Sequence, residues 1–147
     1  MLAIPTPVTL RQPVATSEDY MLLPIEAGFT WAECFEPVDR GDWYLVVFRC
    51  KHRADADEAL LTQLDADAIA AASETPGLHF YFAGTPRATG ECLSFCLWDN
   101  QTSARAASAH AAHRKAMEIG VEHYEYYTLE RYFIQKRPEG LVFVRLP

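Results

Sequence analysis

Residues 91–119 read ECLSFCLWDNQTSARAASAHAAHRKAMEI and contain both kinds of element from which the chain is built. The first part is mostly apolar or aromatic and predicts a strand over residues 91–98. The alanine-rich part that follows predicts a helix over residues 101–119. Three side chains at the junction can cap the start of a helix: Asp99, Asn100 and Thr102. The pattern is therefore a strand that leads directly into a helix.

The segments on either side complete a regular order of elements. We predict strands over residues 43–50, 78–83, 124–135 and 141–144, and a further helix over residues 53–74. The resulting β-α-β-β-α-β order, with a short extra strand, is typical of the ferredoxin-like α+β fold. In that fold, a four-stranded antiparallel sheet carries both helices on one face.

The N-terminal part of the chain differs in composition. Residues 1–42 hold five of the nine prolines, which argues against a continuous helix or a central strand. Its large apolar side chains, among them Phe29, Trp31 and Phe35, need to be covered from water. We therefore predict an N-terminal arm, residues 1–42, that packs on a ferredoxin-like domain of residues 43–147. The arm could instead act as a lid over a pocket or as a clasp between two copies.

Both faces of the predicted sheet are apolar. In the first strand, one face carries Trp43, Leu45 and Val47, and the other carries Tyr44, Val46 and Phe48. Two helices on one face leave the other uncovered, and monomers rarely expose so large an apolar patch. A homodimer that pairs two sheets face to face would cover it. The alternative is that the arm covers this face.

Charge and length exclude several classes of protein. The chain has 147 residues, with 13 Lys and Arg against 20 Asp and Glu, so its net charge of −7 argues against binding to nucleic acid. No apolar run approaches the ~18–20 residues of a membrane span. The start lacks the pattern of a secretory signal, and four cysteines are too few for a disulfide scaffold. We therefore expect a cytoplasmic protein that contacts neither nucleic acid nor a membrane.

Two segments of the C-terminal half, CLSFCLWDNQTSARAASAHAAHRKAM and YEYYTLERYFI, resemble those of antibiotic-biosynthesis-monooxygenase-like proteins. The upstream segments FTWAECF and WYLVVFRC are similar to those of uncharacterised bacterial members, so the resemblance covers residues 21–135. It implies a dimeric α/β barrel with a ligand cleft between the second helix and the sheet. That superfamily includes cofactor-independent oxygenases of aromatic polyketides, haem-degrading monooxygenases, dismutating enzymes and proteins with no known activity, so the fold alone does not specify a reaction.

His113 is the candidate catalytic residue. On the predicted helix it shares the sheet-facing side with Ala106 and Ala109, and such small neighbours could leave room for a ligand. There, an imidazole could act as a general base, a proton shuttle or a haem ligand. The alternative is that His113 is a core residue that packs beneath Trp98.

Five further residues are candidates for ligand binding: Cys96, Trp98, His110, Met117 and Tyr127. The resemblance implies a position near the ligand for Trp98, although core packing would also account for it. Tyr127 belongs to a group of tyrosines on the fourth strand, which either close the barrel or line a pocket.

We expect no cofactor and no metal. The His110-x-x-His113 pair lacks the i, i+4 spacing and the intervening glutamate of helical zinc sites, and no third ligand is spaced to join it. Cys92 and Cys96 would lie roughly 13 Å apart on a strand, too far for a disulfide or a shared metal.

Three functions remain open. The first is a dimeric protein that binds a small apolar or aromatic metabolite. The second is a cofactor-independent monooxygenase that acts on an aromatic, polyketide-like substrate. The third is a haem-binding or haem-degrading protein, for which the resemblance leads us to expect an asparagine on the first strand, and residues 43–50 contain none.

Overall fold

Strand β1 (Gly41–His52) lies at the centre of a five-stranded antiparallel sheet in the computed structural model, which describes residues 9–147. The strand order is β2-β3-β1-β4-β5, with β2 (Leu78–Phe82), β3 (Glu91–Trp98), β4 (Tyr124–Arg137) and β5 (Gly140–Arg145). The first four strands have the order and directions of a ferredoxin-like sheet, so the predicted α+β fold class is confirmed. The extra strand β5 extends the sheet beside β4.

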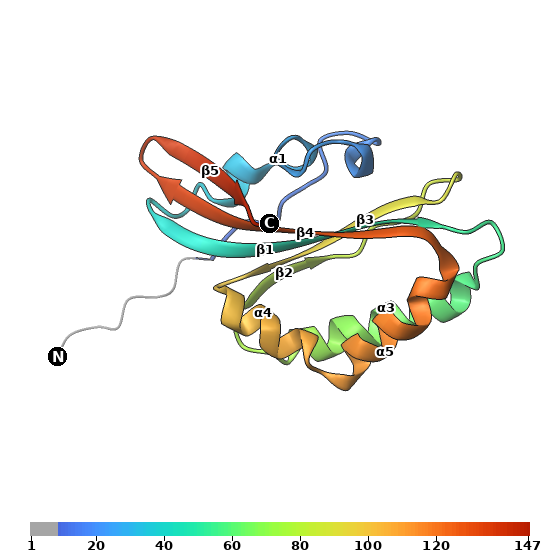
Figure 1. The fold of residues 1–147 in the computed structure, drawn as a ribbon. Coiled ribbons are helices and arrows are strands. Elements are labelled where there is room, and N and C mark those ends of the chain that lie inside the picture. Colours follow the sequence, from blue (N-terminus) through green and yellow to red (C-terminus); the bar gives the residue numbers. More distant parts are fainter. Residues whose placement is uncertain (1–8) are drawn as a thin grey trace.

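Three helices cover one face of this sheet: α3 (Glu58–Ser73), α4 (Gln101–Ser108) and α5 (Ala111–Gly120) (Figure 1). Helix α3 begins later than predicted because Asp57 caps it, and its carboxylate accepts a hydrogen bond from the Leu60 N–H at 3.0 Å. Asn100 caps α4 in the same way, as one of the three predicted caps. Within residues 9–147, no helix has the length and apolar character needed to span a bilayer.

The single helix predicted over residues 101–119 is wrong, because α4 and α5 are separate helices. His110 stands between them with an extended backbone, and its Nδ1 accepts a hydrogen bond from the Ala112 N–H at 3.1 Å. That bond satisfies one of the N–H groups left free where a new helix starts. The break also changes which alanines face the sheet. Ala107 is buried, whereas Ala106 and Ala109, predicted to face the sheet, are exposed.

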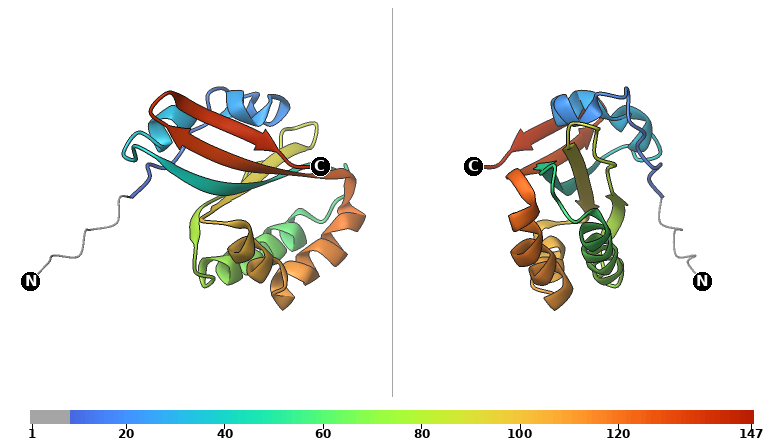
Figure 2. Two further views of the ribbon diagram at one scale, coloured as in Figure 1. Left: turned by 60° about the vertical axis from the view of Figure 1, so that its left-hand side comes forward. Right: turned by 90° about the vertical axis from the view of Figure 1, so that its right-hand side faces the viewer.

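The described part of the arm, residues 9–40, lies on the opposite face of the sheet. It contains the short helices η1 (Tyr20–Leu22), α1 (Ile25–Gly28) and α2 (Trp31–Cys34). Figure 2 shows these helices and α3–α5 on opposite sides of the sheet. The rings of Phe29 and Trp31 pack on Phe95 of β3, with centroids 5.0 and 5.2 Å apart. Residues 1–8 of the predicted arm lie outside the described residues.

The arm therefore takes the place that a second copy was predicted to fill. Leu45, Val47 and Phe95 on this face are fully buried within one chain, so the inference that a partner sheet must cover them does not hold. A homodimer remains a prediction. Four exposed apolar side chains of the sheet lie instead on the helix side of β4 and β5: Leu129, Phe133, Val142 and Val144.

Candidate functional site

A cleft lies between helices α3–α5 and the sheet. Two adjoining hollows form it, with about 700 and 780 Å³ of free space, part of which opens to solvent. We call them the cysteine-side hollow, which Cys50 and Cys92 line, and the tryptophan-side hollow, which Trp98 lines. Their shared lining is Phe48, Tyr81, His113, Met117 and Tyr127, so the two hollows are continuous.

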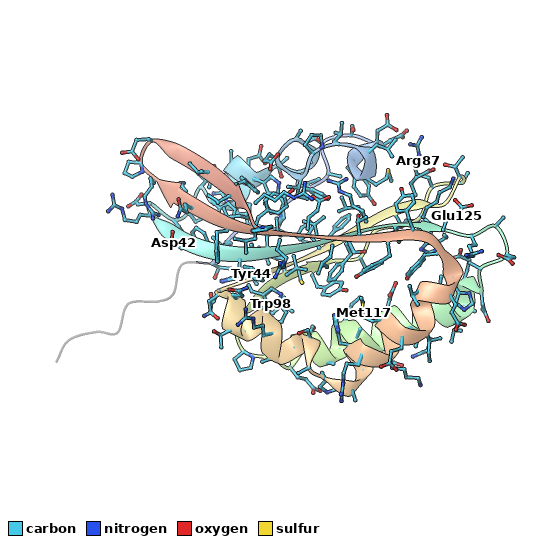
Figure 3. All side chains as sticks on the ribbon, in the orientation of Figure 1. Asp42, Tyr44, Arg87, Trp98, Met117 and Glu125 are labelled. Atoms are coloured by element: carbon cyan, nitrogen blue, oxygen red, sulfur yellow. The ribbon has the colours of Figure 1, made fainter. Side chains whose placement is uncertain are left out.

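The structure brings five of the six candidate residues to this cleft. Figure 3 shows Tyr44 and Trp98 on the α4 side of the sheet and Met117 between α5 and the sheet. His110 is the exception, because it is exposed in the turn before α5 and its Nδ1 is used as a cap. His110 lines neither hollow. The five that line the tryptophan-side hollow are Cys96, Trp98, His113, Met117 and Tyr127.

His113 on α5 is half-buried where the two hollows meet. Burial lowers the pKa of its imidazole below the usual value, since a charged ring loses its hydration there. The ring is therefore neutral at pH 7, and one of its nitrogens has a lone pair that can accept a hydrogen bond or a proton. Among residues 9–147, no carboxylate forms an ion pair with it.

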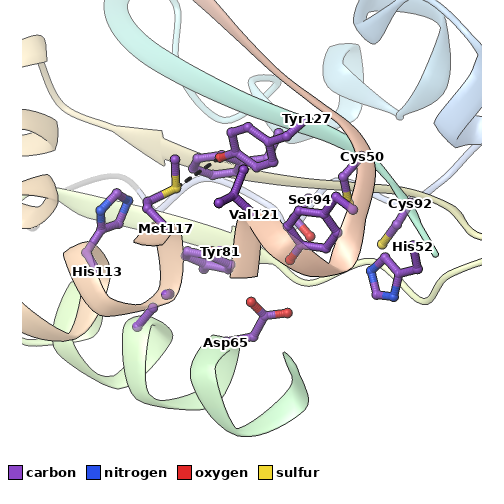
Figure 4. Close-up of a pocket in the computed structure, with 14 residues that line it drawn as sticks. Cys50, His52, Asp65, Tyr81, Cys92, Ser94, His113, Met117, Val121 and Tyr127 are labelled. Carbon is purple, nitrogen blue, oxygen red and sulfur yellow. Dashed lines mark hydrogen bonds between the residues drawn. The ribbon is translucent and has the colours of Figure 1, made fainter. Parts of the chain in front are cut away.

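Phenol groups form the sheet side of the cleft. The Tyr127 hydroxyl donates a hydrogen bond to the Met117 sulfur at 3.4 Å (Figure 4). Burial raises the pKa of Tyr127 and of Tyr81 well above the usual phenol value, so both stay protonated and can donate to a ligand. Met117 is 38% exposed, which places a flexible apolar side chain at the edge of the cleft.

Trp98 belongs both to the apolar core and to the lining of the tryptophan-side hollow. It is 2% exposed and packs with Tyr44, Cys96 and Ala107 in the smaller apolar cluster of the protein. Its indole Nε1 is buried without a hydrogen-bond partner among the described residues. Around it, the tryptophan-side hollow has an apolar floor, whereas Gln101, Arg105 and Arg131 provide polar groups.

A second group of reactive side chains lies at the other end of the cleft, and sequence reasoning missed it. Cys50 on β1 stands directly opposite Cys92 on β3, and His52 follows two residues later on β1. One ligand atom of each side chain lies within 4.8 Å of the others. The Cys-x-His spacing on one strand was visible in the sequence, but only the sheet register brings Cys92 to it.

Comparisons with known proteins support the fold. A family model described as PB2B2.08-like matches residues 8–144. No curated protein matches the sequence.

Solved structures give a wider set of similar folds. One is the protein SO0527 from Shewanella oneidensis, with a TM-score of 0.56, 15% identity, and coverage of 65% of this chain and 93% of that one. A dimeric ferredoxin-like protein of unknown function from Thermobifida fusca has a TM-score of 0.51 and 14% identity, over 63% and 92% of the two chains. A protein from Nitrosomonas europaea, with a proposed role as an antibiotic biosynthesis monooxygenase, has a TM-score of 0.54 and 15% identity, over 63% and 89%.

These identities are low, so the likeness concerns the fold alone. The ferredoxin-like fold is shared, and the expected resemblance to antibiotic-biosynthesis-monooxygenase-like proteins is confirmed at that level. The three solved structures cover 63–65% of this chain, whereas the family model spans both the arm and the sheet domain.

Proposed function

The chain belongs to the PB2B2.08-like family, and from this premise we propose that it binds a small apolar or aromatic metabolite in the cleft between helices and sheet. The observation that carries the proposal is the continuous cleft itself, which opens beneath α4 and α5. Its lining is mostly apolar or aromatic, with few polar groups, as in sites for small organic ligands. Phe48, Tyr81 and Tyr127 offer ring faces and edges for an aromatic ligand.

The tryptophan-side hollow also favours a ligand with a polar end. Arg105 and Arg131 line it, and both are charged at neutral pH. Arg131 already donates to the backbone carbonyl of Pro147 at 2.8 Å, which holds its guanidinium in place. An aromatic molecule with a carboxylate or phenolate would place its ring on the apolar floor and its charge near these arginines.

The test uses 8-anilinonaphthalene-1-sulfonate, an aromatic anion whose fluorescence increases in apolar sites. Ala104 lines the tryptophan-side hollow, whereas Ala106 on the same helix is exposed outside it. Ala104→Phe should remove most of the fluorescence increase by filling the hollow, and Ala106→Phe should keep it. Near-ultraviolet circular dichroism checks that both variants keep native packing, because a molten state also binds the dye. Equal binding by the two variants would contradict the proposal.

A second candidate function is a cofactor-independent monooxygenase, and the neutral His113 in the cleft favours it. The protein of similar fold from Nitrosomonas europaea, with a proposed role as an antibiotic biosynthesis monooxygenase, supports a monooxygenase activity in general. His113 would take the acidic proton of an anthrone-like substrate, and the resulting anion would transfer an electron to O2. Recombination gives a peroxide at the former methylene carbon. The peroxide then loses water and leaves a quinone carbonyl. One oxygen atom of O2 stays in this carbonyl, and the other leaves as water.

An oxygen electrode with anthrone as substrate tests this activity. We expect His113→Ala to lower the rate by about 100-fold or more, the usual contribution of a general base. His110→Ala is the matched control, because His110 lies outside the cleft lining, and it should keep the wild-type rate. Oxygen uptake no faster than in buffer would reject the activity and leave the binding proposal intact. In the same preparation, a shifted haem Soret band lost in His113→Ala would favour haem binding instead.

We propose, further, that the chain forms a homodimer. The described relative from Thermobifida fusca is dimeric, and the exposed strip of apolar side chains on β4 and β5 offers a surface for a second copy. That strip consists of Leu129, Phe133, Val142 and Val144 and adjoins the open side of the tryptophan-side hollow, which Leu129 also lines.

A further inference from the structure

Cys50, His52 and Cys92 form a compact donor set at the cysteine-side hollow. The register of β1 and β3 places Cys50 opposite Cys92 on the helix-facing side of the sheet. Both cysteines are buried, at 8% and 7% exposure, and the His52 side chain is 10% exposed. With one ligand atom of each within 4.8 Å of the others, small side-chain rotations can bring two sulfurs and one nitrogen to a common centre.

A carboxylate holds the His52 ring beside the two cysteines. Its Nδ1 lies 2.9 Å from both carboxylate oxygens of Glu58, which is the first residue of α3. The tautomer that donates the Nδ1–H to Glu58 keeps a lone pair on Nε2. A carboxylate that orients a histidine in this way is the usual outer partner of a metal-bound imidazole.

The backbone beside the cluster is also fixed. The His52 N–H donates to the Gly90 carbonyl at 2.8 Å, just before β3 begins. Gly90 has φ +101°, and a Cβ there would lie 2.4 Å from the His52 carbonyl oxygen. Only glycine fits this close approach, which holds the end of β1 against the start of β3.

The charges around the cluster favour a cation. Glu58 contacts His52 and Asp65 lines the same hollow, so two carboxylates lie beside the cluster. The nearest lysine on β1, Lys51, alternates to the other face and pairs there with Glu91 and Glu125. A bound cation would offset the negative charge of Glu58 and Asp65.

We propose that Cys50, His52 and Cys92 bind a thiophilic divalent transition-metal ion of the zinc class. Two thiolates and an imidazole are the donors that zinc prefers, and three protein ligands leave a fourth position open. That position faces the cysteine-side hollow, which Asp65 of α3 also lines. The ion would then stand at the end of the ligand cleft. The proposal does not depend on which small molecule the cleft holds.

Cobalt(II) is the probe, because it replaces zinc and gives visible absorption in tetrahedral thiolate sites. The full chain, purified without an affinity tag or chelator and kept reduced, should bind one equivalent. It should show both visible d–d bands and a thiolate-to-cobalt charge-transfer band. Cys92→Ser and Cys50→Ser should abolish the charge-transfer band or strongly weaken it. The matched controls are Cys34→Ser and Cys96→Ser, at buried cysteines outside the cluster, and they should keep it.

A second pair of measurements keeps the test decisive if a cysteine variant unfolds. In the unmodified chain, added zinc should slow alkylation of Cys50 and Cys92, as read by mass spectrometry, and leave that of Cys34 unchanged. Glu58→Gln should weaken cobalt binding by about 10–100-fold through loss of the partner on His52. Weak binding that Cys92→Ser does not change would overturn the proposal. A Cys50–Cys92 disulfide, in a chain that binds no metal when reduced, would also overturn the proposal, because the two cysteines would then be a redox couple.

Discussion

Arg49 and Glu130 form a largely buried ion pair, with 2.6 Å between Nε and Oε2 and with only 17% and 11% of their side chains exposed. The same guanidinium donates to the backbone carbonyls of Met21 and Leu23 in the arm, at 2.9 and 2.8 Å. The other carboxylate oxygen of Glu130 accepts a hydrogen bond from Tyr132. This pair therefore joins the centre of the sheet to the arm that covers it.

Removal of Arg49 should loosen the arm. Arg49→Ala leaves Glu130 buried without its partner, and a broken buried pair typically costs about 3–5 kcal/mol. We expect a loss of that order in the free energy of unfolding from urea titrations, together with faster proteolysis within residues 9–40. Arg11→Ala is the control, because its pair with Glu36 at 3.1 Å is more than 60% exposed and should be worth about 1 kcal/mol or less. Equal effects of the two variants would contradict this role for Arg49.

Phe95 is a buried contact between the sheet and the arm. Its ring stacks on Phe82 at 5.4 Å and meets the rings of Phe29 and Trp31, and it is fully buried. Phe95→Ala should lower the free energy of unfolding by about 3–5 kcal/mol, through lost burial and the cavity left behind. Leu22→Ala removes a side chain that is 55% exposed and should change stability by about 0.5 kcal/mol or less. A small effect at Phe95 would show that the arm does not depend on this contact.

His113 should make stability depend on pH. Its folded-state pKa lies below the usual value of about 6.5, so the unfolded chain binds the proton at a higher pH than the folded chain does. The contribution of His113 to the free energy of unfolding should therefore be constant above the usual pKa of about 6.5. It should fall as the pH drops from there toward the folded-state pKa, and level off below the folded-state pKa. His113→Gln should remove this part of the slope in urea titrations over that pH range. A direct NMR titration that places the folded pKa at or above the usual value would refute the prediction.

The apolar strip on β4 and β5 should determine whether two copies associate. Val144→Glu adds a charge at a side chain that is 42% exposed, and it should shift a dimer to monomers in analytical ultracentrifugation. Val14→Glu, at a side chain that is 61% exposed on the arm, is the control and should leave the mass unchanged. A wild-type chain that sediments as a monomer at high concentration would exclude a dimer through this strip.

Local pattern was enough to predict the ferredoxin-like order of strands and helices. Continuous runs of apolar, β-branched and aromatic residues marked β1 and β3, and polar side chains marked the start of α4, where Asn100 accepts a hydrogen bond from the Ser103 N–H at 2.9 Å. These signals depend on neighbours a few residues away, so a single sequence contains them. The same periodicity separates the two faces of each strand, but it does not tell which of those faces meets the helices.

The sequence alone therefore established the order of the elements, the apolar character of both sheet faces and the need to cover each of them. The sequence did not show that the arm covers the second face of the sheet. The hydrophobic effect is non-directional, so a partner sheet would cover that face equally well. Only the tertiary structure paired Arg49 with Glu130, 81 positions apart, and Cys50 with Cys92. Those contacts depend on strand register and long-range packing, which residues near one another in the chain do not specify.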